Sequence, residues 1–352
     1  MNPKLQCLRN KMTSLDLQGL IISNPINIKY LINIEAEGTL LLTRKDNIFL
    51  TDGRYIESVH SILTLYDEVI VYNIADLSKD DFENFFMFCE NVGFEENYVT
   101  YAKYKEYIRK YRINNLVETE NIIEKERLIK DEEELENIKK ACKITDECFE
   151  YILKYIKPGK TEKQIANEIE NYYKKNAHGL AFDTIVASGE NSSKPHAVPT
   201  DRKIQNQDII TIDMGCKYNG YCSDMTRTFF VGKVPEYIKN VYDLVLKVQE
   251  KALEGYKDGA STKLLSKMVE NDFKLEGYTL IHALGHGIGL ECHETPVISY
   301  KNDIFLKEKM VVTDEPGIYI PGKFGIRIED TVQITKFGSI KLTNSEKNYI
   351  II

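Results

Sequence analysis

The sequence predicts an α/β protein of two domains, each of which mixes helices and strands. Its 352 residues suffice for two domains of ordinary size. The first third alternates short helical and strand patterns, whereas the chain beyond about residue 182 shows strands and loops punctuated by glycine. Between these parts lies a densely charged stretch at residues 124–140. We therefore expect one domain at residues 1–123 and a second at residues 124–352.

The first domain is expected to be a compact α/β unit. Lys4–Leu15 places its apolar residues at helical spacing, and Gly19–Ile22 follows as a short apolar run. Phe82, Phe86 and Phe88 belong to an aromatic cluster at helical spacing, which indicates core packing. The remaining expected elements are a helix at Ile26–Ile32, a hairpin of Thr39–Thr43 with Ile48–Thr51, a helix after Asp52–Tyr55 and a strand at Asp67–Ile74.

The second domain is expected to begin with helices and to continue with strands. The charged stretch predicts a long helix whose charges face solvent and which ends at Lys157-Pro158-Gly159. Thr161 and Gln164 have the spacing of a capping box, which starts the next helix. The remaining expected elements are a strand at Phe182–Ser188, a hairpin at Asp208–Phe230, helices at Pro235–Tyr256 and Ser261–Leu275, and strands at Val311–Tyr319 and Gly325–Gln333.

Composition and charge narrow the classes of function. The net charge of −8 argues against nucleic acid or an anionic membrane as a partner. No apolar run approaches the ~20 residues needed to span a bilayer, and the charged N-terminal segment lacks the apolar core of a signal peptide. Seven scattered cysteines without a CxxC pair favour free thiols in a reducing compartment. We expect a soluble, cytoplasmic protein.

Two aspartates on the second hairpin are the first candidates for a site. Asn219-Gly220 is a strong signal for a two-residue turn. With that loop length, Asp213 and Asp224 project from the same face as diagonal neighbours. Gly215 would stand opposite Asp224, without a side chain to fill the space between the carboxylates. Two carboxylates aimed into one gap repel each other unless a proton or cation lies between them. The hairpin therefore predicts a metal site, provided that its loop has an even length.

Three of the six histidines fall in one glycine-rich segment. His282, His286 and His293 lie within HALGHGIGLECHE, where the glycines argue against a helix of the zincin kind. An extended, glycine-rich segment lets single side chains point into a site while its backbone approaches closely. We therefore expect at least one of these histidines to join the aspartates.

Two acidic strand positions complete the set. Glu315 ends an apolar strand directly before a proline, and Glu329 shares a face of the next strand with Arg327. Four carboxylates and one imidazole form an oxygen-rich ligand set that suits two divalent ions such as Mn²⁺ or Co²⁺. Two ions ~3.5–4 Å apart are a recurrent device for hydrolysis. The candidate ligands are Asp213, Asp224, Glu315, Glu329 and one of the three histidines.

The phrases around these residues resemble a known family. IDMG, CSDMTR, GHGIG, EPGIY and GIRIED carry the five ligands as in the Xaa-Pro aminopeptidases and Xaa-Pro dipeptidases (prolidases) of peptidase family M24. NPINIKYL and TDGRY resemble the creatinase-type N-terminal domain of these enzymes, so the resemblance covers nearly the whole chain. It implies a small α/β N-terminal domain, a pita-bread catalytic domain with a curved, mostly antiparallel sheet and covering helices, and a homodimer.

The resemblance also assigns roles to the five ligands. Asp213 would chelate one ion, and His286 and Glu315 would bind the other. Asp224 and Glu329 would bridge the two ions, and Glu315 would carry the proton of a bridging hydroxide. The implied cofactors are two divalent ions, Mn²⁺ in the first place, with Co²⁺ or Zn²⁺ as alternatives.

Further residues would face the substrate. His196 in SSKPHAVP and His293 in GLECHE resemble histidines that stabilise the tetrahedral intermediate and position the carbonyl on the proline side. Together with Glu315 they would form the catalytic set. His282 is a weaker candidate for the substrate pocket.

Two side chains would support the ligands from behind. Arg327, which also counts among the substrate-binding candidates, would orient Glu329 or neighbouring acids. Thr226 would do the same for Asp213 or Asp224.

The resemblance implies a peptidase that hydrolyses the Xaa-Pro bond at the N-terminus of short peptides, by attack of a metal-bridging hydroxide. Some dipeptidases carry an arginine shortly after the His-Glu pair that His293-Glu294 resembles, whereas Val297 occupies that position here. We therefore favour the aminopeptidase, with the dipeptidase as the alternative. A methionine aminopeptidase would leave the first domain unexplained, and a creatinase-like amidinohydrolase would not need five ligands. A non-catalytic peptide-binding module of the same fold is the remoter alternative.

Overall fold

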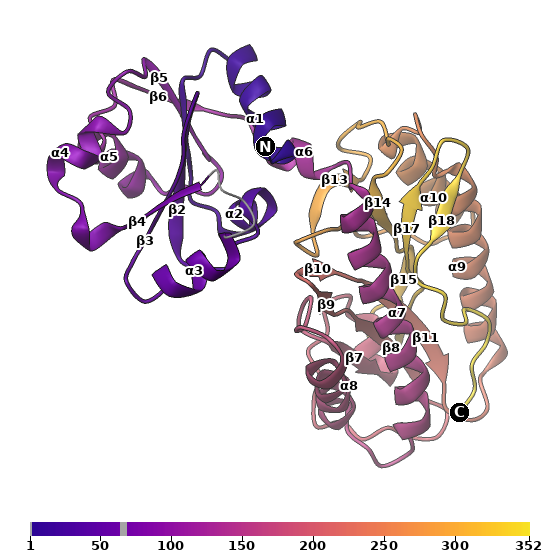
Figure 1. Ribbon diagram of the computed structural model, residues 1–352. Coiled ribbons are helices and arrows are strands. Elements are labelled where there is room, and N and C mark those ends of the chain that lie inside the picture. The colour runs from indigo at the N-terminus through magenta and orange to yellow at the C-terminus, as the bar shows by residue number, and fades with distance from the viewer. Residues whose placement is uncertain (1, 64–68) are drawn as a thin grey trace. The chain divides into compact units, whose positions relative to one another are not determined.

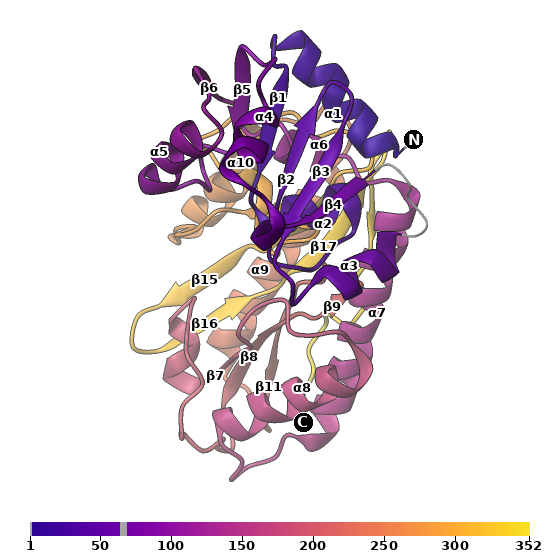
Figure 2. The same ribbon diagram turned by 60° about the vertical axis from the view of Figure 1, so that its left-hand side comes forward.

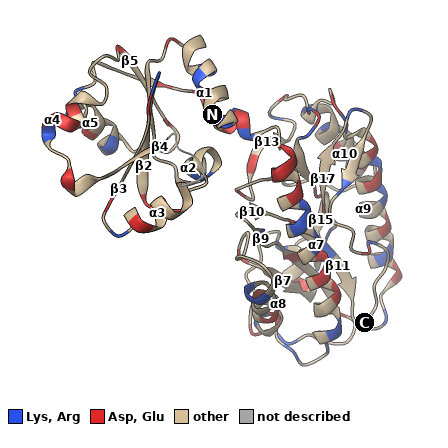
Figure 3. Cartoon of the chain, viewed as in Figure 1, with Lys and Arg blue, Asp and Glu red and all other residues tan. Residues whose placement is uncertain are grey.

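The computed structural model describes residues 2–63 and 69–352. The chain forms two compact units, which divide between Arg127 and Leu128, near the expected boundary at residue 123 (Figure 1). Acidic and basic residues are mixed along the outer helices of both units (Figure 3). None of the described helices is long and apolar enough to cross a membrane.

The first unit is built on one six-stranded sheet. β1, β2 and β3 in its middle pair antiparallel, and the outer strands pair parallel. In spatial order, the strands are β4 (Val69–Asn73), β3 (Asn47–Thr51), β2 (Gly38–Thr43), β1 (Gly19–Ile22), β5 (Asn91–Phe94) and β6 (Asn115–Glu118). The helices are α1 (Pro3–Ser14), α2 (Pro25–Ile32), α3 (Ile56–Leu63), α4 (Lys79–Asn84), α5 (Tyr101–Lys110) and α6 (Glu124–Arg127), with a 3-10 turn at Ile74–Asp76. Figure 1 shows α1 and α2 on one face of the sheet and α4 and α5 on the other.

Most elements predicted for the first domain are present, with one error in its core. The predicted hairpin forms between β2 and β3. The predicted strand at Asp67–Ile74 corresponds to β4 from Val69 onward, and its first two residues lie outside the described part of the chain. Phe86 is buried as expected, but Phe88 is 90% exposed. It lies beyond the end of α4, in a turn, where helical spacing no longer sets its direction.

The second unit holds two helix pairs, each packed on antiparallel strands. The first pair, α7 (Glu132–Tyr155) and α8 (Glu162–Asn176), packs with the sheet of β11 (Met225–Phe230), β8 (Ile209–Met214) and β7 (Ile185–Ser188), as Figure 2 shows for α8. The second pair, α9 (Glu236–Gly255) and α10 (Thr262–Leu275), packs with the sheet of β13 (Glu294–Ile298), β12 (Gly285–Gly287), β14 (Val311–Asp314), β17 (Asp330–Ile334) and β18 (Ser339–Lys341). A 3-10 turn (Gly189–Ser193) and two short ribbons complete the unit: β9 (Lys217–Tyr218) with β10 (Tyr221–Cys222), and β15 (Gly317–Ile320) with β16 (Phe324–Arg327).

The hairpin around Asn219-Gly220 has the predicted register. Asp213 stands opposite Thr226, and Tyr218 opposite Tyr221. Asn219 and Gly220 both have positive φ, 49° and 86°, as a type I′ turn requires. The expectation for Gly215 is wrong: a Cβ there would meet the Ser223 carbonyl oxygen at 2.1 Å. Gly215 permits a close approach of two backbones, and the Ser223 backbone takes the space that its side chain would fill.

The charged stretch at residues 124–140 is not simply a solvated helix face. It contains α6, a short connection and the start of α7, whose first turn carries a capping box of Asp131 and Glu134. Glu126, Arg127, Lys130 and Glu134 are all buried. Lys130 forms an ion pair of 3.0 Å with Glu294, whose position in the sequence is remote. Charge density along a sequence does not reveal such pairings, because the partner comes from a distant segment.

Candidate metal centre

The five predicted ligands come from both sheets of the second unit. Asp213 lies on β8 and Asp224 directly before β11, so the hairpin presents both. His286 lies on the short strand β12, which is extended as the glycines predict. Glu315 follows β14, and Glu329 lies in the break between β16 and β17.

These side chains converge on one place. His286 Nε2 lies 3.6 Å from Asp224 Oδ2 and 3.5 Å from Glu315 Oε1. One ligand atom from each of Asp224, His286 and Glu329 lies within 4.8 Å of the others. Asp213 joins them electrostatically, because its charge raises the pKa of Asp224 and of Glu329. Such spacing of oxygen and nitrogen atoms fits divalent cations.

In three carboxylates of this cluster, one oxygen accepts a hydrogen bond and the other has no partner among the described residues. Arg327 Nη2 donates to Asp213 Oδ2 at 2.6 Å, and the Cys292 thiol donates to Asp224 Oδ2 at 3.0 Å. Thr226 Oγ1 donates to Glu329 Oε2 at 2.8 Å. The second oxygens of all three carboxylates are buried and accept no hydrogen bond from any residue that the structure describes. Buried polar atoms are normally satisfied, so these oxygens fit a cation.

The carboxylates of the cluster are buried and repel one another. Burial first, and the charge of Asp213 second, raise the pKa of Asp224 well above its usual range. Burial and then Asp224 do the same to the pKa of Glu329, and burial raises the pKa of Glu315. A divalent ion reverses this situation, because it favours the charged form of every carboxylate around it.

His286 is arranged as a neutral ligand. Its Nδ1 lies 3.0 Å from the Gly287 carbonyl oxygen, which leaves Nε2 facing Asp224 and Glu315. Burial lowers the pKa of His286, so the neutral imidazole that binds metal ions is favoured. Its backbone N–H donates to Thr313 Oγ1 at 3.0 Å, which fixes β12.

The two supporting residues hold acids of the cluster, and only one of them has an unexpected partner. Arg327, which was expected to orient Glu329 or a neighbouring acid, donates to Asp213. Thr226, which was expected to orient Asp213 or Asp224, donates to Glu329 instead. Arg327 Nε also donates to Thr226 Oγ1 at 2.9 Å, which links the two arrangements.

A chain of hydrogen bonds extends from Arg327 towards His282. Arg327 Nη1 donates to the Tyr319 hydroxyl at 2.8 Å, and that hydroxyl lies 3.1 Å from His282 Nε2. Tyr319 was not predicted, although it ends the EPGIY phrase, which was the available signal. Cys292 was missed as well, since a lone cysteine in a sequence does not reveal its contact with Asp224.

The two remaining histidines border the cluster. The ring of His293 lies 4.3 Å from that of His286, centroid to centroid, and its other side is exposed. His196 is exposed, and it lies near enough to lower the pKa of Glu315 and of His282. The predicted site residues therefore gather around one centre, with His196 and His293 on its accessible side.

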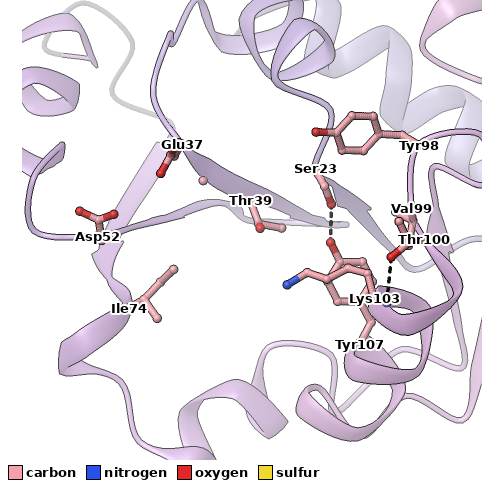
Figure 4. Close-up of a pocket in the computed structure, with 11 residues that line it drawn as sticks. Ser23, Glu37, Thr39, Asp52, Ile74, Tyr98, Val99, Thr100, Lys103 and Tyr107 are labelled. Atoms are coloured by element: carbon pink, nitrogen blue, oxygen red, sulfur yellow. Dashed lines mark hydrogen bonds between the residues drawn. The ribbon is translucent and has the colours of Figure 1, made fainter.

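The first unit contains a cavity whose charged side chains form ion pairs with neighbouring residues. This cavity of about 490 Å³ has Glu37 and Asp52 on one side and Lys103 on the other (Figure 4). Arg54 binds Asp52 at 2.7 Å and Glu37 at 3.1 Å, and Lys103 binds Glu106 at 2.9 Å. The charged groups of this cavity therefore differ from the unsatisfied carboxylates of the candidate metal centre.

Two family models match most of the chain. Residues 136–336 match the model of metallopeptidase family M24, and residues 4–129 match that of the creatinase/prolidase N-terminal domain. The chain is 36% identical to an Xaa-Pro dipeptidase of Pyrococcus furiosus, over 99% of this chain and 100% of that protein. Among solved structures, it is similar to an Xaa-Pro dipeptidase from Bacillus anthracis, with a TM-score of 0.93, 35% identity and 99% of each chain covered. It is also similar to an X-Pro aminopeptidase from Thermotoga maritima, with a TM-score of 0.89, 32% identity and coverage of 97% and 100%. The chain belongs to metallopeptidase family M24 and is a peptidase with the pita-bread fold of the prolidases.

Proposed function

We propose that this peptidase is an Xaa-Pro dipeptidase that uses two divalent metal ions. The observation that carries the metal-dependent chemistry is a set of three buried carboxylate oxygens that have no partner among the described residues, two of them on carboxylates clustered with His286. The dipeptide substrate is supported by relatives: Xaa-Pro dipeptidases of Pyrococcus furiosus and Pyrococcus horikoshii are 36% and 37% identical to this chain.

The relatives thus favour the dipeptidase over the aminopeptidase that the sequence alone favoured. That preference depended on one missing arginine, at Val297. One position on the rim of a site is weak evidence, since another cation nearby can bind the same substrate carboxylate. The aminopeptidase stays as the second candidate, supported by the similar X-Pro aminopeptidase structure from Thermotoga maritima.

The ligand set proposed for the ions is that predicted from the sequence. Asp213, Asp224, His286, Glu315 and Glu329 offer four carboxylates and one imidazole, and four negative charges balance two divalent cations. Oxygen-rich ligands suit Mn²⁺, with Co²⁺ and Zn²⁺ as alternatives. Bound ions of this kind acidify water and polarise the scissile carbonyl.

Other residues would handle the substrate and its protons. Glu315, whose Oε1 lies 3.5 Å from His286 Nε2, would accept and return a proton during hydrolysis. His293 and His196, on the accessible side, would donate hydrogen bonds to the carbonyl oxygens of the substrate. Arg327 holds Asp213 and is itself held by Tyr319, so it keeps the ligands in place. We expect short peptides as substrates, a homodimer as the assembly and the cytoplasm as the location.

Metal analysis combined with a substrate comparison tests the proposal. The purified protein should bind about two Mn²⁺ per chain and hydrolyse an Xaa-Pro dipeptide faster than a tripeptide with the same first two residues. Hydrolysis of the tripeptide alone would establish the aminopeptidase instead. Absence of any bound or activating divalent ion would point to the non-catalytic binding module. The variant Asp213→Asn, which keeps the size of the side chain, should fold and lose metal-dependent hydrolysis.

A further inference from the structure

Lys130 and Glu294 form a buried ion pair beside the candidate metal centre. Lys130 Nζ lies 3.0 Å from Glu294 Oε2, and the two side chains are only 2% and 6% exposed. The backbone N–H of Lys130 donates to the Lys309 carbonyl oxygen at 3.0 Å, so this residue is anchored on both sides. Removing two charges from water is costly, and a buried pair of this kind is weak evidence of a contribution to stability. Its position suggests another role.

The carboxylate of Glu294 is built into the turn that precedes it. Glu294 Oε1 accepts a hydrogen bond from the Glu291 N–H at 3.1 Å. A Cβ at Gly289 would meet both carboxylate oxygens at 2.7–2.8 Å, so the carboxylate packs directly against the Gly289 backbone. The Gly289 carbonyl oxygen in turn accepts a hydrogen bond from the Cys222 N–H at 2.7 Å. The Glu294 side chain thus holds the 289–294 turn together, and a backbone hydrogen bond connects this turn to the hairpin that carries Asp213 and Asp224.

The same turn carries two residues that face the centre. Cys292 donates its thiol hydrogen to Asp224 Oδ2 at 3.0 Å, and the ring of His293 lies 4.3 Å from that of His286. A displacement of the turn would move both contacts together. The charge of Lys130 is therefore connected, through one carboxylate and one turn, to a candidate ligand and to a candidate catalytic histidine.

We propose that Lys130, through Glu294, is a positioning residue that holds the 289–294 turn, and with it His293, in place for catalysis. This inference rests on the proposed function. It gives a role to the charged connection between the two units, which the sequence suggested was only a solvated surface. Lys130 touches neither substrate nor metal in this account, and its effect passes entirely through the turn.

The first test separates positioning from folding by steady-state kinetics on an Xaa-Pro dipeptide with Mn²⁺. At saturating Mn²⁺, Lys130→Met should lower kcat by about 10–100-fold, the range typical for partners that orient site residues, with the same amount of metal bound as in the wild type. Lys130→Arg, which keeps the charge, should recover most of that loss. The matched control is Lys251→Met, which breaks a 2.6 Å pair with Asp272 between the outer helices α9 and α10 and should leave kcat unchanged. A lower Tm together with a wild-type kcat in Lys130→Met would overturn the proposal.

A second variant covers the case in which a lone buried carboxylate prevents folding. The double variant Lys130→Met with Glu294→Met removes both charges, so it avoids an unpaired buried charge. It should fold and still show the lower kcat; a wild-type kcat would overturn the proposal. Hydrogen exchange of segment 285–298 supplies a readout without catalysis, and exchange there should be faster in the double variant than in the wild type. If the wild-type protein fails to hydrolyse dipeptides, the proposed function fails, and unchanged exchange would separately refute the positioning role.

Discussion

Glu329 and Asp330 are consecutive acidic residues, both buried, that face opposite surroundings. Glu329 faces other carboxylates, and its Oε1 has no partner among the residues that the structure describes. Asp330 lies 2.7 Å from Arg227 Nη2 and 2.9 Å from Lys347 Nζ. Burial raises the pKa of Asp330, but these two cations outweigh it and bring the pKa to about 2, whereas the pKa of Glu329 is raised well above its usual range. Asp330 therefore forms ion pairs with two cationic side chains, whereas Glu329 forms none with the residues that the structure describes.

This difference separates structural from functional charge. Arg227 donates to the Glu329 carbonyl oxygen as well as to Asp330, so the paired side also fixes the backbone of the unpaired side. Asp314 lies opposite Asp330 in the ladder, and burial first and the charge of Asp330 second raise the pKa of Asp314. The Glu329 face gathers several carboxylates instead, which is stable only with cations or protons between them.

The largest effect is expected from substitution on the unpaired side. Glu329→Gln should lower kcat/KM for an Xaa-Pro dipeptide by about 1,000-fold or more, because several kcal/mol of transition-state stabilisation depend on the metal centre. Asp330→Asn is the control and should keep most of the activity of its folded fraction. Equal losses in both variants would show that the two positions do not differ as described.

The next effect concerns stability, and here the larger change is expected from Asp330 and not from Glu329. Asp330→Asn should lower the free energy of unfolding by about 3–5 kcal/mol, because it leaves Arg227 and Lys347 buried without their partner. Urea unfolding of the metal-free proteins measures this. In the same experiment Glu329→Gln should be neutral or stabilising, since it removes one of several repelling charges. A clear loss of stability in metal-free Glu329→Gln would contradict the description of that face.

Acid should reveal the paired carboxylate. The pKa of Asp330 is lowered from 3.8 to about 2 on folding, so the unfolded chain binds its proton more readily than the folded chain. The resulting stability, on the order of 2 kcal/mol, is present above pH 4 and is lost as the pH falls towards 2. Acid unfolding of Asp330→Asn should lack this component. Parallel curves for both proteins between pH 4 and 2 would rule it out.

The smallest effect is expected at Cys292. Replacing its thiol by the methyl groups of valine removes one hydrogen bond to Asp224 Oδ2, worth about 1 kcal/mol, and should weaken Mn²⁺ binding by about tenfold. Calorimetric titration of metal-free protein with Mn²⁺ measures the change. Cys89→Val, at a half-buried position in the first unit, is the control and should bind as the wild type does. Unchanged affinity in Cys292→Val would mean that the thiol does not hold Asp224.

Local chemistry made a large part of this site predictable. The Asn-Gly turn gave the register of Asp213 and Asp224, and the glycines around His286 indicated an extended segment. Both signals act over a few residues, where sequence and conformation are directly linked. The family resemblance then assigned a role to each candidate ligand, and the fold that it implied is present.

The unpredicted features all depend on contacts between distant segments. Lys130 and Glu294 are separated by 164 residues, and Cys292 meets Asp224 across 68. Tyr319 gains its importance from Arg327 and His282, which no local pattern connects. Burial and pairing of such residues are set by tertiary packing, so residue type and spacing do not determine them.

Thermal unfolding with and without Mn²⁺ tests the central claim most directly, that the unpaired carboxylates form a divalent-metal centre. Mn²⁺ in excess over its dissociation constant should raise the Tm of the wild type and of Asp330→Asn, because it binds only the folded state. The same Mn²⁺ should raise the Tm of Glu329→Gln much less. A wild-type Tm that does not respond to Mn²⁺, or an equal rise in Glu329→Gln, would contradict the claim.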